Sequence, residues 1–208
     1  MAKLYYFHDP MCSWCYAFSA VLNAIETKLP DSIELIKVVT GLAPDSMTPM
    51  TTELQKTIQA HWKKIEQSVP NVSFNYDFWH KNTAIRSTYP ACRAVLAAKN
   101  QSDDFENEMI SQIQHAYYKN AENPALIEVL IKCAQRCDID IPYFINDLMG
   151  QEIENELQKQ IEFTRQLSVF SYPSLRLESN NTITPINIDY IDAESVTKQI
   201  LLDAERVI

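Results

Sequence analysis

The feature that most constrains the fold is a pair of cysteines, Cys12 and Cys15, at the start of a helical pattern. Residues 4–7 before the pair form a short apolar run that is typical of a buried strand, and residues 16–22 after it have helical spacing. This order places the first sulfur at a helix N-terminus, where free N–H groups and the helix dipole favour an anion. The second sulfur lies one turn along the same face, where it can resolve a mixed disulfide. The pattern therefore predicts a redox-active dithiol.

The same spacing could supply half of a structural zinc site. Such a site needs about four ligands, which a second pair of cysteines or histidines usually completes. The chain has no second Cys-x-x-Cys pair, and its four histidines are scattered. The sequence therefore favours redox chemistry, and we expect no metal.

Composition narrows the classes of partner and the compartment. The 208 residues carry a formal net charge of −9 at pH 7, which disfavours nucleic acid and anionic membranes as partners. Only Gly41 and Gly150 are glycines, so no glycine-rich loop is present to bind phosphate or a dinucleotide. No apolar run is long enough for a signal peptide or a transmembrane helix, and the five cysteines do not resemble a secreted disulfide framework. We therefore expect a cytoplasmic protein.

Local patterns at the N-terminus predict a βαβ unit. Residues 3–8 and 33–39 are expected to form strands, and residues 13–29 a helix between them. Two strands joined by a helix of this length are normally parallel, with a right-handed crossover.

The pattern then becomes helical over residues 45–150. Helices are expected over residues 51–67, 89–100, 103–119, 123–137 and 140–150. A polar helix should follow over residues 151–167, with strands over 174–178 and 182–188. Asp192 should cap a last helix, whose expected apolar positions are Val196, Ile200, Leu201 and Val207.

Without residues 45–150 the predicted order is β-α-β-α-β-β-α, which is the thioredoxin topology. The expected organisation is a thioredoxin-like domain, residues 1–44 and 151–208, interrupted by a helical insertion domain, residues 45–150.

This layout, the segment from Asp9 to Tyr16 and the segment from Tyr172 to Leu175 resemble the DsbA family of thioredoxin-like oxidoreductases. The resemblance is strongest to a cytoplasmic, FrnE-like branch of protein disulfide isomerases. It covers essentially the whole chain, and it implies an α/β thioredoxin-like fold with a large helical insertion.

The resemblance also implies roles for particular residues. Cys12 would be the attacking nucleophile and Cys15 the resolving thiol. A cis Pro173 would face the dithiol and present the backbone of Tyr172 to a substrate, and Ser13 and Trp14 would complete the substrate-binding residues. The implied activity is thiol–disulfide exchange or isomerisation on protein, peptide or small-thiol substrates. No cofactor is implied, and glutathione is a candidate redox partner.

The sequence departs from its relatives inside the motif. Ser13 and Trp14 replace the Pro-His of well-known DsbA oxidants, so no imidazole within the motif stabilises a thiolate. Asp9 is close in sequence and would oppose the thiolate if ionised, and neighbouring arginines and lysines are absent from this stretch. We therefore expect a reduction potential below the roughly −120 mV of the periplasmic oxidant.

Two other functions stay open. The first is a glutathione-dependent transferase or isomerase of the kappa class or the 2-hydroxychromene-2-carboxylate isomerase type, which share the fold and often carry serine in place of the cysteine pair. The second is a binding module without catalysis.

Other candidate residues are expected to pack rather than react. Buried packing positions are expected for Cys92, Cys133, Cys137 and the aromatic residues Phe74, Tyr76, Phe78 and Trp79. Trp14 is expected to be exposed. His8 could hydrogen-bond near the dithiol, and His80, Lys81 and Arg86 could face the cleft. The apolar stripe at Leu54, Ile58, Trp62 and Ile65 could be core or a dimer interface.

Overall fold

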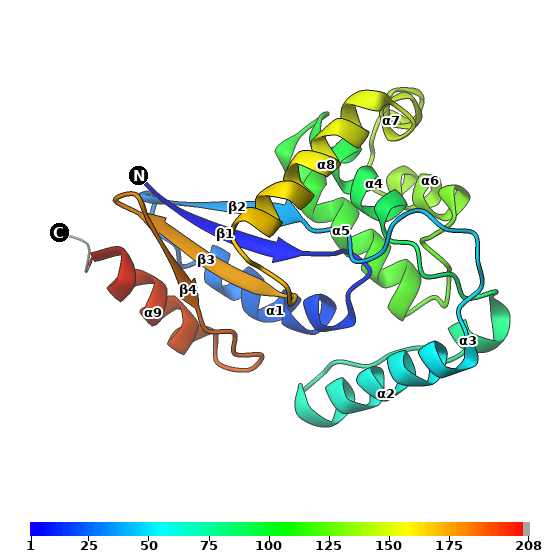
Figure 1. The fold of residues 1–208 in the computed structure, drawn as a ribbon, viewed down its shortest axis with the longest axis horizontal. Coiled ribbons are helices and arrows are strands. Elements are labelled where there is room, and N and C mark those ends of the chain that lie inside the picture. The colour runs from blue at the N-terminus through cyan, green and yellow to red at the C-terminus, as the bar shows by residue number, and fades with distance from the viewer. Residues whose placement is uncertain (206–208) are drawn as a thin grey trace.

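A four-stranded mixed sheet organises the thioredoxin-like part of the protein (Figure 1). The computed structural model describes residues 1–205. The strands are β1 (Ala2–His8), β2 (Ile33–Val39), β3 (Ser174–Ser179) and β4 (Thr182–Ile186), in the spatial order β2-β1-β3-β4. β1 pairs with β2 in parallel, and the other pairs are antiparallel.

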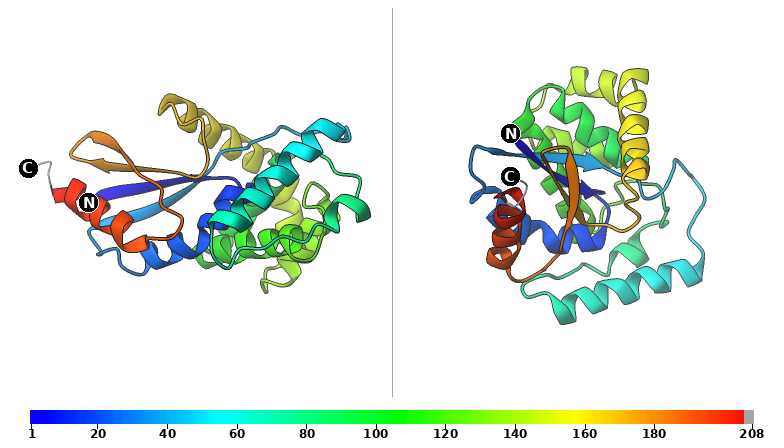
Figure 2. Two further views of the ribbon diagram at one scale, coloured as in Figure 1. Left: turned by 90° about the horizontal axis from the view of Figure 1, so that it is seen from below. Right: turned by 60° about the vertical axis from the view of Figure 1, so that its left-hand side comes forward.

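The alternation of side chains along β1 gives the sheet two buried faces. Leu4 and Tyr6 pack on one face with residues of α1 (Ser13–Glu26) and α9 (Ala193–Glu205). Tyr5 and Phe7 pack on the other face against Phe163 of α8 (Gln151–Gln166). Figure 2 shows these layers from two further directions. The predicted βαβ unit and the thioredoxin-like topology are both confirmed.

Six helices lie between β2 and α8 within the described chain. They are α2 (Thr52–Ser68), α3 (Phe78–Lys81), α4 (Tyr89–Lys99), α5 (Asp103–Tyr118), α6 (Ile127–Gln135) and α7 (Ile141–Leu148). Trp62 lies at the centre of their aromatic packing and stacks on Phe74 at 4.8 Å between ring centroids. The core of these helices continues into Met11 and into Ile153 of α8. The division into two domains stays a prediction.

Most predicted element ends agree with the structure, and the exceptions have local causes. α1 ends at Glu26 rather than at residue 29, because the N–H groups of Lys28 and Leu29 turn back onto the Ile25 carbonyl. α6 begins at Ile127, after a turn in which the Asn123 side chain accepts from the Ala125 N–H. β4 ends at Ile186, two residues earlier than expected.

The predicted turn and cap at the C-terminal side are also present. Asn180 and Asn181 both have positive φ, 49° and 62°, as a tight hairpin turn between β3 and β4 requires. The Asp192 carboxylate accepts from the Ser195 N–H at 2.9 Å at the start of α9. Val207, predicted to be apolar in this helix, lies outside the described residues. Between residues 1 and 205, no helix is long and apolar enough to cross a membrane.

Candidate active site

The dithiol lies where β1 ends and α1 begins. Cys12 is the N-cap residue of α1, with extended backbone, and its sulfur accepts a hydrogen bond from the Cys15 N–H at 3.4 Å. The Cys12 thiol in turn donates to the Tyr172 carbonyl at 3.7 Å. The Tyr172–Pro173 peptide bond is cis, so that prediction is confirmed. The fold therefore brings Cys12, Cys15 and the Tyr172 backbone together, as the resemblance implied.

The two sulfurs differ in their exposure. Both are free thiols; 8% of Cys12 is exposed, whereas Cys15 is completely buried. Burial raises the pKa of the Cys15 thiol well above its ordinary value, and the neighbouring Cys12 adds to the rise. Cys12 is therefore the sulfur that an incoming disulfide can reach first, and Cys15 is protected from solvent.

Asp9 holds the loop that carries Cys12. Its carboxylate accepts hydrogen bonds from the Met11 N–H at 2.8 Å and from the Leu42 N–H at 2.8 Å, and the Cys92 thiol lies 3.6 Å away. Burial raises the pKa of Asp9, although these backbone donors and Thr88 oppose the rise. A raised pKa weakens the opposition to the thiolate expected from Asp9, and the carboxyl instead ties three segments together.

Aromatic side chains surround the dithiol on several sides. The Tyr118 hydroxyl donates to the Met11 carbonyl at 2.7 Å and so fixes the turn before Cys12. Tyr190, from the segment between β4 and α9, lies 5.0 Å from the Trp14 ring. Sequence reasoning missed both tyrosines, because they are far from the motif along the chain.

Trp14 is half-buried, so the prediction that it is exposed is wrong. Its ring packs against Tyr190 and against the core of the helical block. Lys64 of α2 lies 6.0 Å from the centre of the Trp14 ring. The short turn between the cysteines thus meets side chains from distant segments, which the local sequence does not show.

His8 and Cys92 are completely enclosed. His8 stacks on Tyr6 at 4.9 Å between ring centroids, and neither ring nitrogen has a hydrogen-bond partner. Burial lowers the pKa of His8 to about 3, with a further contribution from the charges of Lys37 and Lys99. Its suggested hydrogen bond near the dithiol is therefore absent. Cys92 is buried as predicted, and it contacts Asp9.

A cavity of about 450 Å³ opens beside the dithiol. Its walls include Cys12, Ser13 and Trp14 from the motif, together with residues of α2 and of the segment before α4. Arg86 and His61 are among them. Of the residues predicted to face a cleft, Arg86 therefore does so, whereas His80 and Lys81 are exposed and do not line this cavity.

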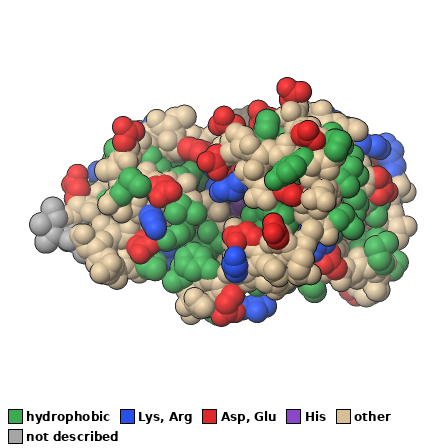
Figure 3. Space-filling model, turned by 90° about the horizontal axis from the view of Figure 1, so that it is seen from above, with side chains coloured by type: hydrophobic (Ala, Val, Ile, Leu, Met, Phe, Trp, Pro, Cys, Tyr) green, Lys and Arg blue, Asp and Glu red, His purple; other side chains and the backbone are tan. Residues whose placement is uncertain are grey.

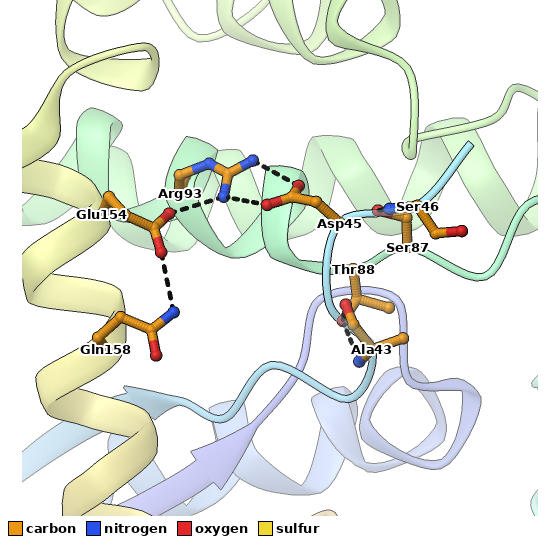
Figure 4. A network of polar contacts seen from close by, with 8 residues as sticks. All are labelled: Ala43, Asp45, Ser46, Ser87, Thr88, Arg93, Glu154 and Gln158. Carbon is orange, nitrogen blue, oxygen red and sulfur yellow. Dashed lines mark hydrogen bonds and ion pairs between the residues drawn. The ribbon is translucent and has the colours of Figure 1, made fainter. Parts of the chain in front are cut away.

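A polar network fixes the segment that follows β2, from which Leu42 lines this cavity (Figure 4). Arg93 of α4 bonds to Asp45 at 2.7 Å and to Glu154 of α8 at 2.8 Å. The Ala43 N–H donates to the Thr88 hydroxyl at 3.1 Å, in the same segment. The segment that supplies Leu42 to the cavity is thus tied to both α4 and α8, while Asp45, Arg93 and Glu154 themselves line a separate cavity.

The remaining predicted residues are placed as follows. Cys133 and Cys137 are buried free thiols, and the aromatic residues from Phe74 to Trp79 pack around Trp62, as predicted. Trp62 and Ile65 of the α2 stripe are core, whereas Leu54 and Ile58 are half-buried and line the cavity. No cluster of three or more metal-ligating side chains occurs in the described part of the chain.

Comparison with known proteins agrees with this architecture. A family model described as thioredoxin matches residues 5–198, nearly the whole chain. The protein belongs to this DsbA-like thioredoxin family. The structure is similar to that of a candidate protein disulfide isomerase from Nitrosomonas europaea, with a TM-score of 0.85, 23% identity, and coverage of 97% of this chain and 96% of that one.

The names of two further similar proteins describe different functions, a disulfide reductase and an adapter. The cytosolic disulfide reductase DsbM of Pseudomonas aeruginosa has a TM-score of 0.78 at 20% identity, with 97% of this chain and 98% of that chain covered. The ClpXP adapter protein SpxH of Halalkalibacterium halodurans is 22% identical over 183 residues, which are 86% of this chain and 59% of the adapter. The chain thus spans about three fifths of the length of the curated relative.

Proposed function

We propose that the protein is a thiol–disulfide oxidoreductase that works through Cys12 and Cys15. The observation that carries this proposal is the placement of Cys12: the residue caps a helix N-terminus, is 8% exposed and borders a cavity, and its sulfur accepts from the Cys15 N–H. The N–H groups of a helix N-terminus favour a thiolate, which is the nucleophile in exchange.

The geometry supports a two-step reaction. The Cys12 thiolate attacks one sulfur of a substrate disulfide, forms a mixed disulfide and releases the other half as a thiolate. The Cys15 thiol gives its proton to the first released thiolate, and its sulfur then attacks the Cys12 sulfur. This step closes the internal disulfide and releases the second half of the substrate as a thiolate. Because Cys15 is buried beside Cys12, it is held for the second step and kept from reacting with other disulfides.

Two kinds of partner fit the site. Tyr172 offers its backbone next to Cys12, which suits an extended peptide with a disulfide or thiol. The cavity suits a small thiol, and a structure of DsbM with glutathione is similar to this chain. We propose protein thiols and glutathione as partners. We propose the cytoplasm as the location, because DsbM is named a cytosolic disulfide reductase.

The test is to accumulate the mixed-disulfide intermediate. In Cys15→Ser, Cys12 can still attack a disulfide, but no second thiol is present to release the substrate from Cys12. Mixed disulfides through Cys12 should therefore accumulate when oxidised glutathione or a disulfide-bonded peptide is added. Mass spectrometry after acid quenching measures the adduct. Cys133→Ala is the matched control and should form no stable adduct. Absence of Cys12 adducts in Cys15→Ser would overturn the assignment.

The adapter relatives favour a second candidate, a binding module. The match to SpxH covers most of this chain, and the name of that protein describes an adapter. A redox titration with glutathione separates the two: an exchange enzyme shows a reversible two-electron transition of Cys12 and Cys15, whereas a pure adapter does not require one. A transferase or isomerase is distinguished by Cys12→Ser, which a transferase could tolerate and an exchange enzyme could not.

A further inference from the structure

The cavity beside the dithiol is basic, in an acidic protein. The chain has a net charge of −9, and acidic side chains are scattered over the face drawn in Figure 3. Yet none of the described residues that line the cavity is acidic, whereas Arg86 and His61 both belong to its walls. This contrast marks the cavity as a place where a negatively charged group is stabilised.

Arg86 is also unusual among the arginines. Arg93, Arg136 and Arg165 each have a carboxylate partner, and Arg176 donates to a backbone carbonyl. In residues 1–205, Arg86 alone among the arginines makes neither an ion pair nor a hydrogen bond. Its charge opposes the rise that burial causes in the pKa of Tyr117, another residue of the same cavity wall. The guanidinium is therefore near the cavity and available to a ligand.

We propose that Arg86, with His61, selects small thiols and disulfides that carry a carboxylate over neutral or cationic ones. The inference rests on the proposed exchange function and names its small-molecule substrate class. Arginine binds a carboxylate through two parallel hydrogen bonds, and the imidazole of His61 can supply another donor. The volume of about 450 Å³ lies within the roughly 300–1,000 Å³ that small-molecule sites occupy.

The proposed preference for carboxylates acts in the first step of exchange, in which the mixed disulfide forms on Cys12. When the Cys12 thiolate attacks the disulfide, one half becomes bonded to Cys12 and the other leaves as a thiolate. The half that stays bonded to Cys12 borders the cavity that Arg86 also lines, so that Arg86 can bind its carboxylate. Cys15 then displaces this half, so one disulfide is reduced to two thiols while the protein dithiol becomes a disulfide.

The experiment compares rates for disulfides of opposite charge. Reduced protein is mixed with oxidised glutathione, which carries carboxylates, or with cystamine, which is cationic, and oxidation is followed by thiol alkylation. In Arg86→Gln the ratio of the two rates should fall by roughly fivefold, as expected for a partly exposed ion pair. Arg86→Lys should retain part of the ratio, and high salt should reduce the ratio in the wild type.

A matched control separates local recognition from net charge. Arg136→Gln removes one positive charge at the end of α6, away from the cavity lining, and should leave the ratio unchanged. Equal changes in Arg86→Gln and Arg136→Gln, or no change in either, would overturn the inference.

A second measurement keeps the two proposals separable. S-methylglutathione cannot exchange, so its binding by the wild type and Arg86→Gln, followed by NMR titration, tests recognition alone. Weaker binding in Arg86→Gln supports carboxylate recognition even if no disulfide is reduced, in which case the exchange function fails. Equal binding by both proteins overturns carboxylate recognition and leaves the exchange function to its own test.

Discussion

Cys12 and Cys15 lie at the N-terminal end of α1, whereas Cys133 lies in the last turn of α6 and Cys137 follows the C-cap residue of that helix. At α1, the Cys15 N–H donates to the Cys12 sulfur, in addition to the bond of 3.7 Å that the Cys12 thiol donates to the Tyr172 carbonyl. At α6, the Cys137 thiol donates to the Cys133 carbonyl at 3.3 Å, and no backbone N–H within residues 1–205 donates to its sulfur. An N–H donor stabilises a thiolate, and a carbonyl acceptor stabilises the protonated thiol.

The surroundings add to this difference. Burial raises the pKa of Cys133 to about 12 and that of Cys137 to about 11, and both side chains belong to the core. Cys12 instead borders a cavity. Two cysteine pairs of similar spacing thus have different surroundings, and the end of the helix and the contact with a cavity are the reasons why we propose exchange chemistry for Cys12 and Cys15 alone.

The largest expected effect is on exchange itself. Cys12→Ser should lose reduction of oxidised glutathione completely, because within residues 1–205 Cys12 is the one cysteine that both caps a helix and lines the cavity. Cys133→Ala should keep the wild-type rate. The measurement is the rate of thiol release in a stopped-flow assay. Comparable losses in both variants would mean that the contrast between the two pairs does not govern the chemistry.

Alkylation of the folded protein should sharpen the contrast without mutation. At neutral pH, iodoacetamide should modify Cys12 on the order of a hundredfold faster than Cys133 or Cys137, since these two are buried and protonated. Peptide mass spectrometry at timed quenches gives the three rates. In guanidinium chloride the rates should converge; rapid native labelling at Cys133 would contradict the packing described for α6.

A smaller effect concerns stability near the reactive pair. His8 is neutral when folded, with a pKa of about 3 against 6.5 in the unfolded chain. Below pH 6.5 only the unfolded chain gains this proton, so the wild type loses stability as pH falls toward 3.

Replacing this histidine measures the effect directly. Relative to His8→Phe, the wild type should lose about 2 kcal/mol of unfolding free energy between pH 7.5 and pH 5, measured by urea titration. His80→Gln, at an exposed position, is the control and should show no comparable pH-dependent difference. A pH-independent difference in His8→Phe would show that this strand end is hydrated rather than enclosed.

Much of the site was predictable because its signals are local. One continuous stretch of sequence holds the apolar run, the Cys-x-x-Cys motif and the helical pattern that follows it. The structure has the same order, with β1 before the motif and α1 after it. Pro173 was predictable only through the family resemblance. Asp9 was recognised as a charge near the thiols, but its hydrogen bonds to Met11 and Leu42 depend on the meeting of two loops.

The cavity residues could not be predicted with the same certainty. His61 and Arg86 come from segments far from Cys12 along the chain, and Tyr190 comes from near its other end. No periodicity relates such residues, since their proximity depends on how the helical block packs against the start of α1. The same packing half-buries Trp14, which its immediate neighbours gave no reason to expect.

The sequence by itself determined the strand–dithiol–helix order, the alternating faces of β1 and the thioredoxin topology, because each follows from hydrophobic period and helix-end chemistry over a few residues. Only the tertiary structure decided which sulfur is accessible, that Asp9 joins three segments, and that Arg86 and His61 share a cavity with Cys12. These features depend on burial and on contacts between distant segments, which arise only when the chain packs.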